Sequence, residues 1–235
     1  ARRALGVMAP HAGYIYSGAV AGEVYASVAL PHRFVIIGPN HTGLGPPASL
    51  MAEGTWRLPG GDVAIDTALA GDILSRSSVL TADSSAHAHE HSIEVQLPFL
   101  QYLAGALEFV PVSLMVTDAA SCRDVGEAVA AAIAGRDEPV LIVASSDMTH
   151  YESQEEAQRK DRLALDRILA LDPDGLLETV RIHGISMCGV APAAAMLYAC
   201  KQLGAAGAEM VKYETSGDVT GDFNQVVGYA GVVVF

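Results

Sequence analysis

The chain has 235 residues, of which 51% are hydrophobic and 17% are charged, a balance that excludes a disordered chain or a coiled coil and favours a compact α/β protein. Asp and Glu total 27 against 14 Lys and Arg, giving a formal charge of -13, so nucleic acid is not an expected partner. No apolar stretch approaches the roughly 18 residues of a membrane-spanning helix, so a membrane is not expected either. We expect one domain over residues 1–235.

The predicted elements alternate between strands and helices. Short apolar runs predict strands at residues 6–9, 34–38, 108–113, 140–145, 209–213 and 229–235. Helical patterns lie between them at residues 17–28, 66–75, 91–103, 119–134, 153–171, 173–182 and 192–203. The segment 43–61, which contains Trp56, is expected to be an irregular connection with a short hairpin near the site. The alternation predicts a layered α/β fold, with a central sheet flanked by helices.

Histidine-containing loops follow three of these strands. His11 follows strand 6–9, and His41 follows strand 34–38. In open α/β sheets the ligand crevice lies beyond the carboxyl ends of the strands, so these loops are expected to share one site. A single loop histidine can simply hydrogen-bond a carbonyl group, but two at strand ends favour a metal ion.

The third loop, after strand 140–145, contains Asp147 and His150. Their spacing lets the carboxylate accept a hydrogen bond from the imidazole and fix its tautomer, as beside an acid/base group. The alternative is that Asp147 or Ser146 caps a helix, and both roles can coexist.

Cys188 is the expected third metal ligand, because it stands just ahead of the predicted helix 192–203. A helix N-terminus lowers the pKa of a thiol and favours the thiolate, which binds metals or attacks electrophiles. The alternative is a small buried hydrophobe, the interpretation we prefer for Cys122 and Cys200. Three cysteines without CxxC spacing argue against a disulfide framework, so we expect a cytoplasmic protein.

The segment HAHEHSIE, residues 87–94, holds further candidates. His87 and His89 are expected to be exposed. His91 and Glu94 would share one face of the predicted helix, and with Asn40 they are expected to line the cleft.

Together these motifs resemble the Memo family, whose bacterial and archaeal members are often called AmmeMemoRadiSam system protein B. The resemblance rests, in chain order, on APHAGYIYSG, GPNHTG, EHSIEVQLPFLQ, SSDMTHY, the pair Cys188 and Gly189, and SGDVTGDFNQVVGYA. It implies the fold of the class III (LigB-type) extradiol dioxygenases.

Those dioxygenases hold Fe(II) with two histidines and one carboxylate, and a further histidine acts as acid/base. The resemblance implies that His11 and His41 are the histidine ligands, that His150 is the acid/base group, and that Cys188 replaces the carboxylate. A thiolate is softer and more oxidisable, which favours Cu(I), Zn or thiolate-bound iron over ordinary catechol cleavage.

Three functions remain open. The first is a metal-binding protein that holds Fe(II) or Cu at His11, His41 and Cys188, with Zn as a further candidate. In this case His150 and Asp147 would serve oxygen-dependent or redox chemistry on a small molecule. The second is a non-enzymatic module that binds a peptide or partner protein in the same cleft. The third is a hydrolase in which Cys188 attacks and His150 or His11 is the base. Metal content separates the first from the third.

Overall fold

The computed structural model describes residues 3–235, and four parallel strands form the centre of its sheet. In spatial order these are β1 (Gly6–Ala9), β8 (Val140–Ser145), β2 (Arg33–Pro39) and β7 (Glu108–Leu114). The antiparallel strands β11 (Val226–Val234) and β10 (Ala208–Thr215) extend the sheet beyond β1. The six predicted strands are confirmed. The near-continuous apolar sequences of β1, β2, β7, β8 and β11 reflect burial on both faces, whereas the edge strand β10 is partly exposed.

Five further strands complete the sheet: β3 (Ala48–Leu50), β4 (Thr55–Leu58), β5 (Gly61–Ile65), β6 (Thr81–Ala82) and β9 (His150–Glu152). β4 and β5 form the short hairpin expected near residues 43–61. That segment is more regular than expected, because β3 and β5 both pair with the outer edge of β7. These runs are short and mostly mix polar with apolar residues, so they lack the continuous apolar signal of a buried strand.

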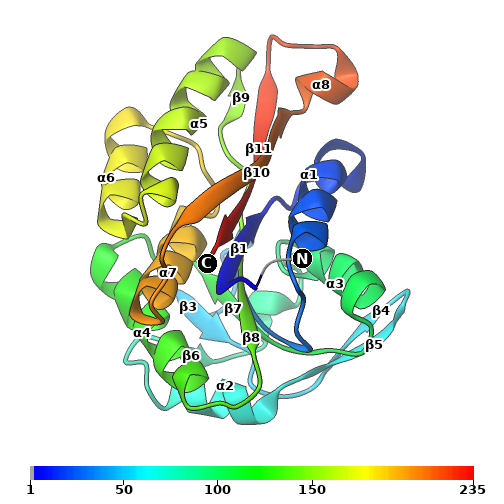
Figure 1. Cartoon of the computed structure of the whole chain (residues 1–235), viewed down its shortest axis with the longest axis vertical. Helices are drawn as coiled ribbons and strands as arrows, with labels where there is room; N and C mark the ends of the chain where they lie inside the picture. The colour runs from blue at the N-terminus through cyan, green and yellow to red at the C-terminus, as the bar shows by residue number, and fades with distance from the viewer. Residues whose placement is uncertain (1–2) are drawn as a thin grey trace.

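Helices cover both faces of the sheet, as Figure 1 shows. On one side α1 (Tyr14–Ser27) packs on β1, β10 and β11 and contacts α3 (Leu97–Ala104). On the other side α7 (Val190–Gln202) packs on β1, β2 and β8 and contacts α4 (Ala119–Ala134) and α6 (Pro173–His183). α5 (Gln154–Leu169) contacts α6, and α2 (Thr67–Leu74) contacts α4. The single turn α8 (Gly217–Thr220) lies between β10 and β11. The layered α/β prediction is confirmed.

The third predicted helix begins six residues later than expected. The sequence pattern suggested a helix over residues 91–103, but α3 starts at Leu97, after a 3₁₀ turn at Glu94–Gln96. Pro98 explains the difference, because proline is tolerated in the first turn of a helix and disrupts its interior. His91 therefore lies in a loop and is free to approach the strand ends.

Within residues 3–235, no helix is long and apolar enough to cross a lipid bilayer. The largely apolar helix α7 is instead buried at the centre of its layer, where all residues from Val190 to Cys200 have little exposed surface. A helix that is apolar on all sides is typical of such a central position.

Candidate metal centre

The carboxyl ends of β1, β8 and β2 meet at one edge of the sheet, because these neighbouring strands run parallel. His11 follows β1, Asp147 follows β8, and His41 follows β2. The imidazole centroids of His11 and His41 lie 5.3 Å apart. The strand order thus brings together residues that are far apart in the sequence.

A buried hydrogen-bond network fixes the ring of His11. The Ser145 hydroxyl donates to the Ser92 carbonyl oxygen at 2.6 Å and accepts from the Gln96 amide at 2.9 Å. Since its only proton is used, this hydroxyl accepts from Nδ1 of His11 at 2.9 Å. Nε2 of His11 therefore carries the lone pair. Burial is the main reason why the pKa of His11 falls to about 4, so the ring is neutral near pH 7.

His41 is held by a carboxylate instead. Glu90, which is 3% exposed, accepts hydrogen bonds from Nδ1 of His41 at 2.9 Å and from the backbone N–H groups of His41 and Ser92. Burial alone would raise the pKa of Glu90, but these hydrogen bonds outweigh it and lower the pKa to about 2. The same bond raises the pKa of His41 above its usual value. A carboxylate can only accept a hydrogen bond, so the proton of neutral His41 is on Nδ1. The lone pair of its Nε2 is therefore available, as it is in His11.

Replacing Glu90 with glutamine should lower the pKa of His41. Glutamine can still accept the hydrogen bond, but it supplies no negative charge to offset the burial of the imidazolium. NMR titration of the imidazole signals would measure the change. The control is Glu94→Gln, on the same segment, which should leave the His41 titration unchanged. An unaltered pKa in Glu90→Gln would contradict the role assigned to this carboxylate.

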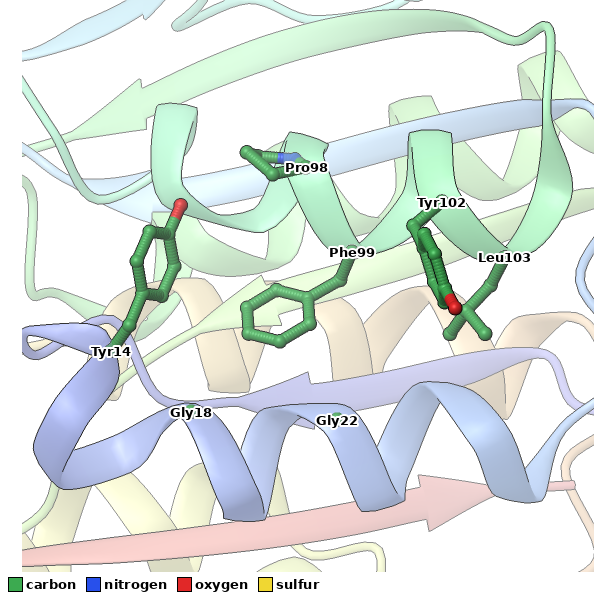
Figure 2. Close-up of a pocket in the computed structure, with 7 residues that line it drawn as sticks. All are labelled: Tyr14, Gly18, Gly22, Pro98, Phe99, Tyr102 and Leu103. Carbon is green, nitrogen blue, oxygen red and sulfur yellow. The ribbon is translucent and has the colours of Figure 1, made fainter. Parts of the chain in front are cut away.

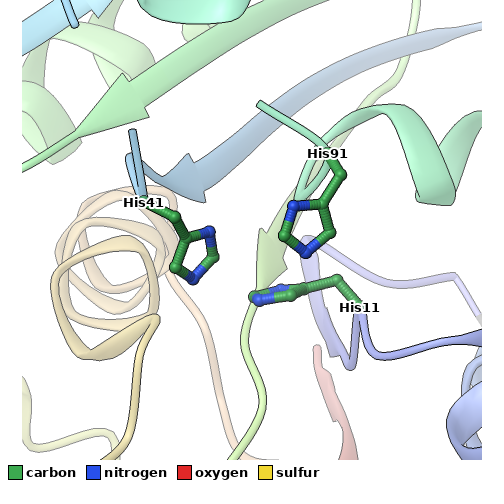
Figure 3. Close-up of side chains that lie close together, drawn as sticks. All are labelled: His11, His41 and His91. Carbon is green, nitrogen blue, oxygen red and sulfur yellow. The ribbon is translucent and has the colours of Figure 1, made fainter. Parts of the chain in front are cut away.

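A third imidazole joins these two, as Figure 3 shows. The ring of His91 stacks on that of His41 at 5.1 Å with an interplanar angle of 20°, and its centroid is 5.6 Å from that of His11. One nitrogen from each of the three rings lies within 4.8 Å of the other two. The sequence suggested only that His91 lines the cleft.

Cys188 belongs to a second donor group, which it forms with His11 and Asp147. Its Sγ lies 3.3 Å from Nε2 of His11 and accepts from the backbone N–H of Asp147 at 3.3 Å. The predicted ligands therefore divide between two groups that share His11: His41 lies in one and Cys188 in the other.

Gly189 explains how the thiol comes so close to the strand end. A Cβ atom at this position would stand 2.3 Å from the Ser145 carbonyl oxygen and 2.4 Å from Cβ of Ser146, closer than any real contact. The glycine lets the start of α7 pack directly on the end of β8. The pairing of Cys188 with Gly189 is thus a packing requirement of the site.

The structure corrects the expected acidity of Cys188. The thiol does stand just before α7, but burial, aided by the charge of Asp147, raises its pKa to about 12. Desolvation outweighs the helix N-terminus here, so a thiolate requires a bound cation. Cys122 and Cys200 are buried within α4 and α7, and burial also raises their pKa values to about 12.

Asp147 does not orient His150, contrary to our expectation. Oδ1 of Asp147 accepts from the backbone N–H groups of His11 and Ala12 at 2.8 and 3.2 Å. Nδ1 of His150 instead lies 2.8 Å from the carbonyl oxygen of Ser186. This carbonyl group, and not Asp147, fixes the tautomer of His150. Asp147 does not cap a helix either, since α5 is capped by Ser153. Asp147 thus shapes the His11 loop, and His150 is tied to the segment that carries Cys188.

Other expected cleft residues have different environments. The Asn40 side chain accepts from Thr42 and Gly43 and donates to the Leu44 carbonyl, so it shapes its own loop. His89 is exposed as expected. His87 is only 7% exposed, because the β4–β5 hairpin places Trp56 against it, with ring centroids 6.0 Å apart.

An apolar groove of about 480 Å³ lies between α1 and α3 (Figure 2). The Phe99 ring lies over Gly18 and Gly22, at 3.9 and 3.8 Å from the Cβ positions there, which is ordinary van der Waals contact. Its lining comprises Tyr14, Gly18, Gly22, Pro98, Phe99, Tyr102 and Leu103. Glu94 lines an adjoining groove with Tyr14 and Leu58. Glu94 thus faces the adjoining groove and belongs to neither donor group identified among residues 3–235.

The sequence analysis missed Glu90, Gln96 and Ser145, which hold the histidines in place. Only Glu90 gave a usable signal: it directly precedes His91, and a carboxylate beside a candidate ligand is a candidate orienting group. Gln96 and Ser145 resemble ordinary core-flanking residues, and their partners are distant in sequence.

Comparisons with known proteins agree with the resemblance noted from the motifs. The family model for Memo-like protein matches residues 1–233. A MEMO1 family protein of Methanopyrus kandleri is 49% identical over 232 residues, covering 97% of this chain and 82% of the relative. One from Methanothermobacter thermautotrophicus is 45% identical, covering 97% of this chain and 84% of the relative. The crystal structure of an uncharacterized protein from Escherichia coli K12 matches with a TM-score of 0.62 at 15% identity, covering 97% of this chain and 99% of that one.

Proposed function

The chain belongs to the Memo family, and from this premise we propose that it binds one iron or copper ion at His11, His41 and Cys188, for redox chemistry on a small molecule. One observation carries the proposal: Nδ1 of His11 and Nδ1 of His41 are each held by a buried acceptor, Ser145 or Glu90. Metal-binding histidines are typically held in this way, with the other ring nitrogen left for the ion.

The donor set fits such an ion. Imidazole and thiolate are preferred by copper, zinc and thiolate-bound iron, whereas magnesium and calcium prefer oxygen ligands. His11 is already neutral, so one of the donors is available without losing a proton. A bound iron or copper ion would supply electron transfer and the activation of oxygen.

The remaining residues act on the small molecule and on the ligands. Because Nδ1 of His150 faces a carbonyl oxygen, its Nε2 is free to accept a proton from a small molecule or, once protonated, to donate one. Asp147 holds the backbone of the His11 loop, and its Oδ2 lies 3.9 Å from Nε2 of His11. His150 is accordingly the proposed acid/base group, and Asp147 is a positioning residue.

A Cys–His hydrolase is a weaker candidate, although Sγ of Cys188 and Nε2 of His11 are only 3.3 Å apart. The pKa of the thiol is raised to about 12 and that of the imidazole is lowered to about 4, so the proton stays on sulfur. Such a pair is a poor nucleophile without a cation. A peptide-binding module, the other alternative, would bind its peptide equally well with or without metal.

Elemental analysis of protein purified without oxygen tests the proposal. The wild-type chain and the Cys122→Ala variant, which changes a buried thiol outside the site, should each hold one iron or copper ion. Cys188→Ala should hold much less. Failure of the wild-type chain both to retain metal and to take up added Fe(II) or Cu(I) would refute metal binding. Uptake of zinc alone would refute the redox part.

A further inference from the structure

The ring of His91 lies on the solvent side of the three-imidazole group. It lies in the loop before the 3₁₀ turn, and its side chain is 58% exposed, against 37% for His41 and 2% for His11. Figure 3 shows the three imidazoles around a common space. An exposed histidine with no structural role would be free to extend into water, but this ring stacks on His41.

One carboxylate positions both exposed rings. Oε1 of Glu90 lies 2.9 Å from Nδ1 of His41 and 3.5 Å from Nδ1 of His91. The rings are nearly parallel, so with both Nδ1 atoms turned to the same oxygen they offer their Nε2 atoms in similar directions. This is the arrangement expected of two ligands that share one orienting group.

The three rings converge on one small space. One nitrogen from each ring lies within 4.8 Å of the other two, a spacing that small side-chain movements would bring to the bond lengths of about 2.0 to 2.1 Å of a shared ion. His11, His41 and His91 already form one donor group, whereas His41 and Cys188 are connected only through His11.

We infer that His91 is a further metal ligand, which joins His11 and His41 in one group of three imidazoles. This inference rests on the proposed function. Three imidazoles and a thiolate make four protein ligands, the number typical of a closed tetrahedral site. With four protein ligands the site would be closed, so access for a small molecule would require one of them to move aside. His91 has the most exposed side chain of the three imidazoles and would be that ligand.

The test compares His91→Ala with His89→Ala, which removes an exposed imidazole two residues away in the same loop. Zn²⁺ is the probe, and its affinity is measured by competition with a chromophoric chelator. His91→Ala should lower the affinity by about tenfold or more, since even disturbing the support of a ligand has effects of that size. It should also speed transfer of the ion to the chelator. X-ray absorption of the zinc-loaded proteins should show one imidazole fewer in His91→Ala than in His89→Ala.

The outcomes separate the two proposals. If wild-type protein binds Zn²⁺ and His91→Ala binds it with the same affinity and imidazole count, His91 is not a ligand and the proposed site stands without it. If wild-type protein binds no Zn²⁺, Fe(II) or Cu(I), the proposed function fails and the inference fails with it.

Discussion

Replacing His11 with asparagine should abolish tight metal binding. The imidazole belongs to both donor groups, so its removal breaks the three-histidine face and also the contact with Cys188. Asparagine places an amide nitrogen near the former Nδ1 and retains the hydrogen bond to Ser145, but it offers nothing at the Nε2 position. We expect the affinity for Cu(I) or Zn²⁺ to fall by at least about 100-fold. The loss of a group that merely orients a ligand lowers metal affinity by up to about 100-fold, and the loss of the ligand itself should cost more.

Chelator competition measures this loss, and thermal unfolding of the metal-free protein shows whether the fold is intact. His89→Ala again serves as the control, because its imidazole is exposed outside the cluster. A stable His11→Asn protein that keeps wild-type affinity would place the metal elsewhere. The prediction therefore tests the position of the site independently of its chemistry.

The position of the site could be predicted because it depends on the strands. β1, β2 and β8 are buried apolar runs, and the residues after them lie at the carboxyl edge of a parallel sheet whatever the details of packing. His11 and His41 follow directly from this rule. Cys188 followed from its place before a helix, and the structure brings it to the same edge.

The interactions that hold the candidate ligands in place could not be predicted in this way. Ser145 and Gln96 meet across 49 residues of sequence, and Glu90 reaches His41 across the same separation. Such pairs depend on how α3 packs, and its start was misplaced because Pro98 was not weighed against the helical pattern. The acidity of Cys188 was wrong for a related reason: a helix N-terminus is visible in the sequence, but burial is not.

Metal affinity should rise with pH, by about tenfold per pH unit and so about 100-fold between pH 6 and 8. The raised pKa of Cys188, about 12, keeps the free thiol protonated throughout this range, so each ion that binds sulfur releases one proton. His11, with its pKa lowered to about 4, is already neutral and releases none. The pKa of His41 is raised by its hydrogen bond to Glu90, so its proton steepens the dependence only toward the acidic end.

Cu(I) titrations at several pH values, with proton release measured calorimetrically in buffers of different ionisation enthalpy, would check this dependence. Cys188→Ser should bind more weakly and lose most of the slope near pH 8, because serine has no proton that copper displaces readily. Cys200→Ala, a buried thiol on the same helix, should keep the wild-type slope. A slope that survives in Cys188→Ser would mean that the proton comes from another ligand. The sulfur would then not bind the ion, and the three imidazoles would form the whole site.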